Sequence, residues 1–220
     1  MKEDVLEQIV DDYLQFLGYF TIHNVRFKPS LDHPEFIRNQ DAVASDVDVV
    51  GYNPKLPAPH RVVVVSCKAY QDGFDATAKL AQLRGDSKNP KRETWKHFRE
   101  LWVPKWSEAF HAAIEERTGE TVFSYTLAVT RLRSSADGWA TDPTILTNLA
   151  GSTFSVLTLE EMWSTLLREV TTTPATSEIG RLAQLLKAAG LTAPYQVAHP
   201  SGPLPGSDAA IKASVEDSIE

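Results

Sequence analysis

The chain has 220 residues, of which 42% are hydrophobic and 23% charged, and this composition is typical of a folded protein and unlike that of fibrous or disordered chains. Its 29 Asp and Glu outnumber its 22 Lys and Arg, so the net charge of −7 argues against a protein that coats nucleic acid in general. Apolar runs stay far below the roughly 18 residues of a membrane span, there is a single cysteine, and acids stand where a signal peptide would be basic, so we expect a cytoplasmic protein that does not enter a membrane.

The N-terminal region is predicted to hold one helix and one strand. Between residues 3 and 17, apolar side chains recur at the three-four spacing of an amphipathic helix, and Gly18 supplies a stop. Residues 19–27 are rich in aromatic and β-branched side chains, which favours a strand that ends before Pro29. The stretch 29–40 mixes Pro, Asp, His and Asn without a period and is interpreted as a loop.

Residues 45–52 and 61–70 are predicted to be two strands of a hairpin, because three prolines between them force the chain to turn. Side chains alternate between the two faces along each strand. A roughly symmetric loop therefore places two pairs on one face, Asp48 near Ser66 and Asp46 near Lys68. The valines expected on the opposite face, towards the core, are Val47, Val49, Val63 and Val65.

The rest of the chain is predicted to combine helices with two more strands. We expect helices over 74–83, over 92–116 with a break near Pro104, over 159–170 and over 179–189, and strands over 121–130 and 152–157. A helix or loop is expected between those two strands. Thr158 and Glu161 have the spacing of a capping box. The composition becomes linker-like after residue 171, which predicts one domain over 1–172, followed over 173–220 by a linker, a short amphipathic helix and a flexible tail.

The hairpin and the first helix carry side chains suited to metal-dependent cleavage of a phosphodiester. Asp48 would supply a hard oxygen ligand to Mg²⁺, and a bound metal polarises the scissile phosphate and activates water. Lys68 would position the attacking water and stabilise the negative charge that develops on the phosphate. Glu7 on the predicted first helix is placed to reach the same metal or its water shell.

These segments resemble the PD-(D/E)XK nuclease superfamily, and most closely its Mrr-type restriction endonuclease and archaeal Holliday-junction resolvase branch. The resemblance covers about residues 3–130 and rests on three stretches, LEQIVDDYLQFLGYFT, SDVDVVG and VVVVSCKAYQ. It implies an α/β restriction-endonuclease-like fold, with a mixed central sheet flanked by helices and here a helical C-terminal extension. It further implies cleavage of DNA with Mg²⁺ or Mn²⁺, by a homodimer or with a partner subunit. By the same resemblance, Asp48, Lys68 and Glu7 match the family's Asp, Lys and helix acid, and Gln71 matches a polar position after the Lys.

Ser66 departs from the pattern, because the family has Glu or Asp at this position. A neutral hydroxyl binds Mg²⁺ far more weakly than a carboxylate does. The missing charge has three candidate sources, namely Asp46 on the neighbouring strand and Asp72 or Asp75 at the start of the next helix. The sequence does not choose between them, and Ser66 itself either fills the remaining coordination position or orients it.

Residues 88–106 interleave basic and aromatic side chains within an otherwise acidic protein. Such a pattern suits contact with phosphates and stacking on bases. The alternative, preferred for the aromatic residues, is a core helix with Trp95, Phe98, Trp102 and Trp106 at spacings of three and four. Arg131 and Arg133 either contact a phosphate or solvate a loop. Cys67 lies on the apolar side of its strand by parity, which favours a buried structural thiol over a nucleophile.

Three classes of function are compatible with these patterns. The first is the metal-dependent nuclease. The second is a non-catalytic module that binds nucleic acid or acts as a scaffold, having kept the fold and lost the metal. The main observation in its favour is Ser66 at the position where the family has an acid. The third is an interaction protein that works through the amphipathic helix 179–189, although a helix of this length more often packs on its own domain.

Overall fold

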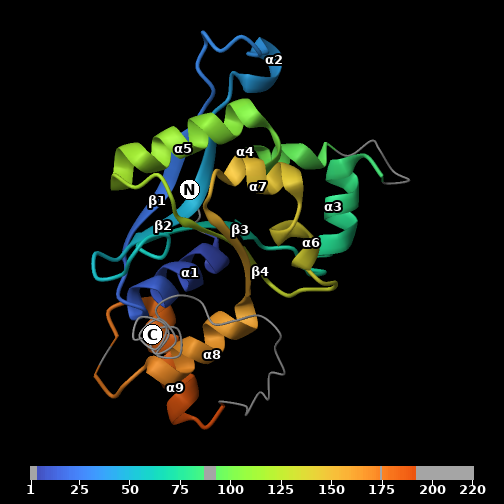
Figure 1. The fold of residues 1–220 in the computed structure, drawn as a ribbon. Coiled ribbons are helices and arrows are strands. Elements are labelled where there is room, and N and C mark those ends of the chain that lie inside the picture. Colours follow the sequence, from blue (N-terminus) through green and yellow to red (C-terminus); the bar gives the residue numbers. More distant parts are fainter. Residues whose placement is uncertain (1–3, 87–92, 174, 192–220) are drawn as a thin grey trace, which may run out of the picture.

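The computed structural model describes residues 4–86, 93–173 and 175–191, and its centre is a mixed sheet of five strands in the order β1-β2-β3-β4-β5 (Figure 1). The strands are β1 (Phe20–Phe27), β2 (Ser45–Tyr52), β3 (Val62–Lys68), β4 (Ser124–Val129) and β5 (Thr153–Thr158). The first three strands pair antiparallel, whereas β3, β4 and β5 pair parallel. The expected α/β class, with a mixed sheet flanked by helices, is confirmed.

Helices cover both faces of the sheet (Figure 1). One face packs against α1 (Val5–Phe16) and α8 (Leu159–Glu169), with α9 (Glu178–Ala188) beyond them. The other face carries α3 (Ala76–Arg84), the 3-10 helix η1 (Thr94–His97), α4 (Arg99–Trp102), α5 (Pro104–Thr118), α6 (Asp137–Ala140) and α7 (Pro143–Leu149). None of the helices in the described part of the chain is both long and apolar enough to cross a membrane.

Helix α1 forms where its periodicity predicts it and packs closely on the sheet. Asp4 caps it by accepting a hydrogen bond from the Leu6 amide, and the residue after its last turn, Gly18, has φ +83°. Gly51 of β2 lies directly beneath this layer. A Cβ atom there would stand 3.2 Å from Tyr19 Cβ and 3.3 Å from Leu14 Cδ1, so the absence of a side chain lets the helix approach the strand.

The register of the β2–β3 hairpin agrees with the symmetric-loop prediction. Gly51 pairs with Val63 and Val49 with Val65, and the ladder ends there, one residue short of the predicted pairing of Asp48 with Ser66. As predicted, the side chains of Val49, Val63 and Val65 pack in the cluster beneath α1 and α8.

The prediction for Val47 is wrong, because its side chain joins the opposite cluster with Val25 and Phe27. Its neighbour across the sheet explains the change of face. The β1–β2 ladder passes over Asn24, which adopts a left-handed φ of +54°. A residue in this conformation bends its strand and interrupts the alternation of side chains. The interruption falls opposite Asp48.

The helical face departs from the sequence prediction in detail. The segment expected as one or two helices before and after Pro104 contains η1, α4 and α5, and Pro104 begins α5 as a first-turn proline. A short helix, α2 (Arg38–Asp41), occurs in the stretch interpreted as a loop. Asp41 stabilises it through tertiary contacts, since its carboxylate accepts hydrogen bonds from Lys105 Nζ at 2.7 Å and Trp106 Nε1 at 3.0 Å.

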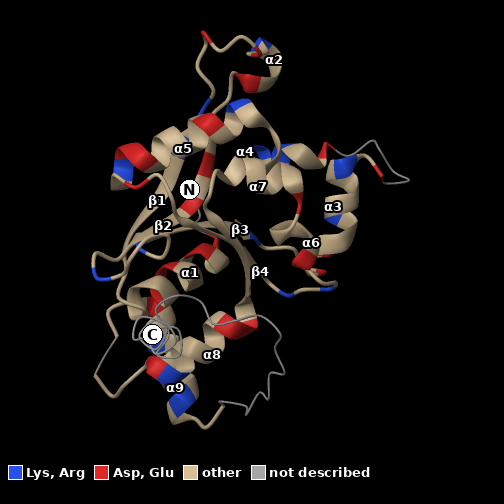
Figure 2. Cartoon of the chain, in the orientation of Figure 1, with Lys and Arg blue, Asp and Glu red and all other residues tan. Residues whose placement is uncertain are grey.

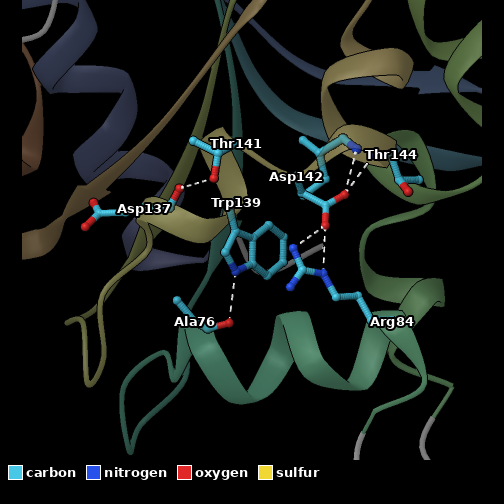
Figure 3. Close-up of polar contacts among 8 residues, drawn as sticks. Ala76, Arg84, Asp137, Trp139, Thr141, Asp142 and Thr144 are labelled. Carbon is cyan, nitrogen blue, oxygen red and sulfur yellow. Dashed lines mark hydrogen bonds and ion pairs between the residues drawn. The ribbon is translucent and has the colours of Figure 1, made fainter.

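Buried hydrogen bonds join α3, α6 and α7 into one unit (Figure 3). The indole of Trp139 donates from Nε1 to the Ala76 carbonyl. Asp142 caps α7 by accepting from the Thr144 amide and also forms an ion pair with Arg84 of α3, with 2.7 Å between Arg84 Nη2 and the carboxylate. These contacts fix α3 against the sheet near the end of β3.

The C-terminal helix α9 packs against α1 and α8. The buried carboxylate of Asp12 on α1 accepts hydrogen bonds from Ser177 Oγ at 2.6 Å and from the Gly180 amide at 3.1 Å. Ala183 is fully buried. The predicted capping box of Thr158 and Glu161 is confirmed at the start of α8. The tail expected to be flexible lies outside the described residues beyond 191.

Candidate functional site

The structure brings Asp48, Ser66 and Lys68 together where β2 and β3 part. Lys68 Nζ donates a hydrogen bond to Ser66 Oγ at 2.9 Å. Asp48 Oδ2 accepts from the Cys67 amide at 2.5 Å, so the side chain occupies the place that a strand carbonyl holds elsewhere in a ladder. Ser66 is buried, and both Asp48 and Lys68 are half-buried. These three residues are termed the hairpin cluster.

The carboxyl group of Asp48 is held in opposing fields. Burial raises the pKa of Asp48, and the charge of Asp46 raises it further. Lys68, the Cys67 amide and the Ser66 hydroxyl act in the opposite direction without cancelling the effect of burial. The negative charge on Asp48 is therefore incompletely compensated, which is the condition under which a cation stabilises a carboxylate site.

Glu7 reaches this region from α1. Burial raises the pKa of Glu7, and the charges of Asp48, Asp4 and Asp46 raise it further. The sign of these effects shows that the carboxylates act on one another as like charges. Glu7 is half-buried, whereas Asp46 is exposed. Glu7 and Asp46 therefore lie within electrostatic range of Asp48.

The remaining sequence candidates lie apart from the hairpin cluster. Gln71 is exposed in the turn after β3, and among the described residues no hydrogen bond or ion pair joins it to Asp48, Ser66 or Lys68. Asp75 instead caps α3, accepting from the Ala78 amide and from the Ser134 hydroxyl.

Asp72 is likewise exposed, and its carbonyl accepts a hydrogen bond from Arg131. Arg131 and Arg133 hold the neighbouring loop, because their backbones bond to Phe74. Of the three candidate replacements for the missing acid, Asp46 is the one that the structure places beside Asp48.

A buried carboxylate absent from the sequence prediction stands behind the cluster. Glu100 of α4 is 5% exposed and accepts a hydrogen bond from Tyr125 Oη at 2.6 Å. Tyr125 hydrogen-bonds in turn with Ser66. Burial raises the pKa of Glu100, whereas the charge of Lys68 lowers it. A chain of contacts therefore runs from Glu100 through Tyr125 and Ser66 to Lys68. The sequence gives little indication of this residue, because Glu100 is a single acid among buried aromatic neighbours and its helix of four residues is too short to show a hydrophobic period.

Cys67 faces the opposite side of the sheet from Lys68, as parity predicts. Its side chain packs with the cluster beneath α1 and α8. Burial raises the pKa of the Cys67 thiol, and the charges of Asp48 and Glu7 raise it further. The thiolate needed for nucleophilic chemistry is therefore disfavoured.

The aromatic residues of the predicted basic and aromatic stretch serve the core. Phe98 and Trp106 are fully buried, and Trp95 and Trp102 pack against the same cluster. The core role that the sequence favoured is confirmed, whereas the single helix expected to carry these residues is divided among η1, α4 and α5. The basic residues at 88, 91 and 92 lie outside the described residues.

The donor atoms near Asp48 fit a hard cation in type. Across the described ranges, no three side chains among Asp, Glu, His and Cys are close enough to form a ready metal site. Oxygen atoms of Asp48, Glu7 and Asp46, with water, are the ligands that Mg²⁺ and Mn²⁺ accept. Burial and the neighbouring carboxylates raise the pKa values of Asp48 and Glu7, and a bound cation would offset this repulsion between like charges.

Comparison of the chain with protein-family models, with curated proteins and with solved structures gave no match.

Proposed function

We propose that this chain is a nuclease that hydrolyses phosphodiester bonds in DNA with Mg²⁺ or Mn²⁺. The observation that carries the proposal is that Asp48 and Lys68 lie at one end of the hairpin, with Glu7 and Asp46 within electrostatic range of Asp48. The α/β fold with a mixed sheet supports the restriction-endonuclease-like arrangement that the sequence resemblance implies.

In this proposal the charged side chains divide the chemistry between them. Asp48 and Glu7, with Asp46, hold the metal, which when bound polarises the phosphate and lowers the pKa of a water. Lys68 orients the attacking water and stabilises the negative charge that builds on the phosphate oxygens. The water oxygen forms the new bond to phosphorus as the bond to the leaving sugar oxygen breaks; the water gives up a proton to solvent, and the leaving oxygen takes a proton from solvent to become a hydroxyl. Ser66 keeps Lys68 in place through the hydrogen bond to Oγ.

A second candidate function is a non-catalytic module that binds nucleic acid, and Ser66 is the observation that favours it. Its hydroxyl stands where the resembling family has a carboxylate, and it already accepts a hydrogen bond from Lys68. A site with one fewer carboxylate binds a divalent cation more weakly. In this alternative the fold binds nucleic acid without cutting it.

The deciding experiment is cleavage of plasmid and branched DNA in the presence of Mg²⁺ or Mn²⁺. We expect cleavage by the wild-type chain and a loss of about 100-fold or more in Asp48→Asn and Lys68→Ala, because each removes a charge that acts in the transition state. Asp32→Asn is the matched control, since Asp32 is exposed in the loop after β1. Far-ultraviolet circular dichroism checks that each variant is folded. Wild-type protein that binds DNA and leaves it intact with both metals would favour the second candidate.

A further inference from the structure

Basic side chains from several elements gather beside Lys68, on the side of the sheet opposite α1. Lys79 comes from α3, His97 from η1 and Arg99 from α4. The charges of Lys68, Lys79 and Arg99 all act on the imidazole of His97. Figure 2 shows acidic residues along α1 and basic residues along α3. The surroundings of the hairpin cluster are therefore divided into an acidic side, with Glu7 and Asp46, and a basic side.

Aromatic rings hold the cations of the basic side. Lys68 Nζ lies 6.0 Å from the centroid of the Phe98 ring, and the Arg99 guanidinium lies 4.6 Å from that of Trp106. An aromatic face attracts a cation without neutralising it, because the ring carries no net charge. Neither Lys68 nor Arg99 forms an ion pair with any carboxylate among the described residues.

Arg99 has further hydrogen-bonding capacity. Its Nε atom is buried and has no hydrogen-bond partner in the described structure. A guanidinium has five N–H donors in a planar fork that matches two oxygens of a phosphate. Its position on the Trp106 ring fixes the plane of that fork before any ligand arrives, which reduces the entropy lost on binding.

The groups around His97 disfavour its protonation. Burial lowers the pKa of His97, and the charges of Lys68, Lys79 and Arg99 lower it further. Asp48 and Glu100 act on Lys68 as opposite charges, whereas the charges that act on His97 are all positive. An anion bound among these groups would relieve the repulsion and favour protonation of His97.

The geometry points to a phosphate site formed by Lys68, His97 and Arg99, which takes a backbone phosphodiester of DNA adjacent to the bond that is cut. The inference rests on the proposed function for the choice of DNA as ligand. Lys68 is shared, because its charge acts both on Asp48 and on His97. The bound strand then passes from the acidic side over β3 towards α4.

The test is binding of a fluorescent DNA duplex in EDTA, measured by anisotropy over a range of KCl concentrations. Arg99→Gln should weaken binding about tenfold and reduce the slope of log K against log salt by about one, because one phosphate contact is lost. Lys55→Gln is the matched control, since Lys55 is exposed at the far end of the hairpin, and it should leave affinity and slope unchanged. Equal affinity and slope for Arg99→Gln and the wild type would overturn the inference.

Two further variants separate charge from packing. Arg99→Lys keeps a cation on Trp106 and should retain the wild-type salt slope with an affinity between those of the wild type and Arg99→Gln. His97→Gln should weaken binding more at about pH 6 than at about pH 8, because only the protonated imidazole attracts the phosphate. A loss in Arg99→Lys as large as that in Arg99→Gln, or no pH dependence attributable to His97, would contradict the assignment.

The outcomes also separate this inference from the proposed function. DNA that is bound through Arg99 in EDTA but remains uncut with Mg²⁺ would support the phosphate site and refute the nuclease. DNA that is cut by Arg99→Gln with unchanged KM and unchanged binding would support the nuclease and refute the phosphate site. Wild-type protein that binds no duplex in low salt would refute the phosphate site.

Discussion

At the scale of single residues, Lys68 depends on a buried chain of partners. Ser66 accepts its hydrogen bond, Tyr125 contacts Ser66, and Glu100 accepts from Tyr125. A carboxylate that is 5% exposed is costly to keep charged unless a cation compensates it, and the nearby cation is Lys68. We therefore interpret Glu100 as a positioning residue that, in its ionised form, acts on the ammonium of Lys68.

Glu100→Gln tests this interpretation, because the amide keeps an acceptor for Tyr125 and removes the charge. We expect kcat for DNA cleavage to fall about tenfold with KM unchanged, since Lys68 acts in the chemical step. The variant should fold as the wild type does. Burial raises the pKa of Glu100 above its ordinary 4.5, so the stability contributed by its neutral form is present below pH 4.5 and is lost as the pH rises through the folded-state pKa. Urea unfolding should show that the free energy of unfolding of Glu100→Gln rises relative to that of the wild type as the pH increases over that range.

Asp142→Asn is the matched control for Glu100→Gln, because Asp142 is equally buried but belongs to the unit of α3 and α7. Its kcat should stay at the wild-type value at temperatures where it is folded. If Glu100→Gln retains full kcat across the pH range, the carboxylate is a structural group and its charge plays no part in catalysis.

Ser66→Asp tests whether this position limits metal binding. A carboxylate there should lower the apparent Kd for Mg²⁺ by about tenfold, because it adds a charged oxygen ligand beside Asp48. The measurement is the rise in melting temperature with Mg²⁺ concentration. Ser66→Asn has the same shape without the charge and serves as the control. Identical Mg²⁺ dependence in the two variants would show that another acid, Asp46 first among them, already fills the position.

At the scale of elements, a buried ion pair attaches α2 to α5. Lys105 Nζ lies 2.7 Å from Asp41 Oδ2, and neither side chain is more than 7% exposed. Burial raises the pKa of Asp41, but the hydrogen bonds from Lys105, the Ile37 amide and Trp106 outweigh it and leave the pKa below its usual value. The stability that this carboxylate contributes is therefore present above about pH 4 and is lost as the pH falls through the folded-state pKa.

Lys105→Met should lower the free energy of unfolding by about 3–5 kcal/mol, because it leaves the Asp41 carboxylate buried without a counter-charge. Urea unfolding at neutral pH measures the loss. In the double variant Asp41→Asn with Lys105→Met the loss should be smaller, since no isolated charge remains. If Lys105→Met is as stable as the wild type, α2 can detach from α5 without lowering the free energy of unfolding.

Local patterns predicted most elements, and the failures have a common physical cause. The helix α1 and the hairpin register follow from side-chain spacing and loop symmetry, which depend on neighbours in sequence. In contrast, α2 depends on residues of α5 more than 60 positions later in the chain. The altered face of Val47 depends on the backbone of Asn24 in another strand.

The candidate site divides in the same way. Asp48, Ser66 and Lys68 meet because strand parity and register are local properties, and the sequence predicted their convergence. Glu100 lies in a helix of four residues after β3, which is too short for a hydrophobic period to predict. Its partnership with Tyr125 joins positions 25 residues apart. Tertiary packing alone brings these residues to the site.

At the scale of the whole molecule, the predicted boundary near residue 172 separates segments that are in contact. The residues after it fold back through α9, and Asp12 of α1 bonds to Ser177 and Gly180. Gln184 of α9 also donates to the carbonyl of Thr171 at 2.7 Å. Helix α9 therefore covers one end of the layer formed by α1 and α8, while the sheet lies on the other side of α1 (Figure 1).

A chain that ends at Thr173 should still unfold cooperatively, with an unfolding free energy about 2–4 kcal/mol lower. The loss follows from exposing the apolar contacts of α9 and from removing two hydrogen bonds from the buried Asp12 carboxylate. Thermal unfolding measures it, and Ser177→Ala, which removes one of those bonds, should lose about 1 kcal/mol. Non-cooperative unfolding of the shortened chain would show that residues 1–172 do not form a domain by themselves.

The close approach of α1 to the sheet at Gly51 has a consequence for how the site tolerates change. Any side chain at position 51 meets Tyr19 and Leu14, so it would displace the first helix by a few tenths of an ångström. A shift of that helix would change the separation between Glu7 and Asp48. Under the proposed function, the affinity of the carboxylates for a shared cation would thus be set partly by a residue that contacts neither of them. Variation at this glycine would adjust metal affinity in small steps while leaving every ligand chemically intact.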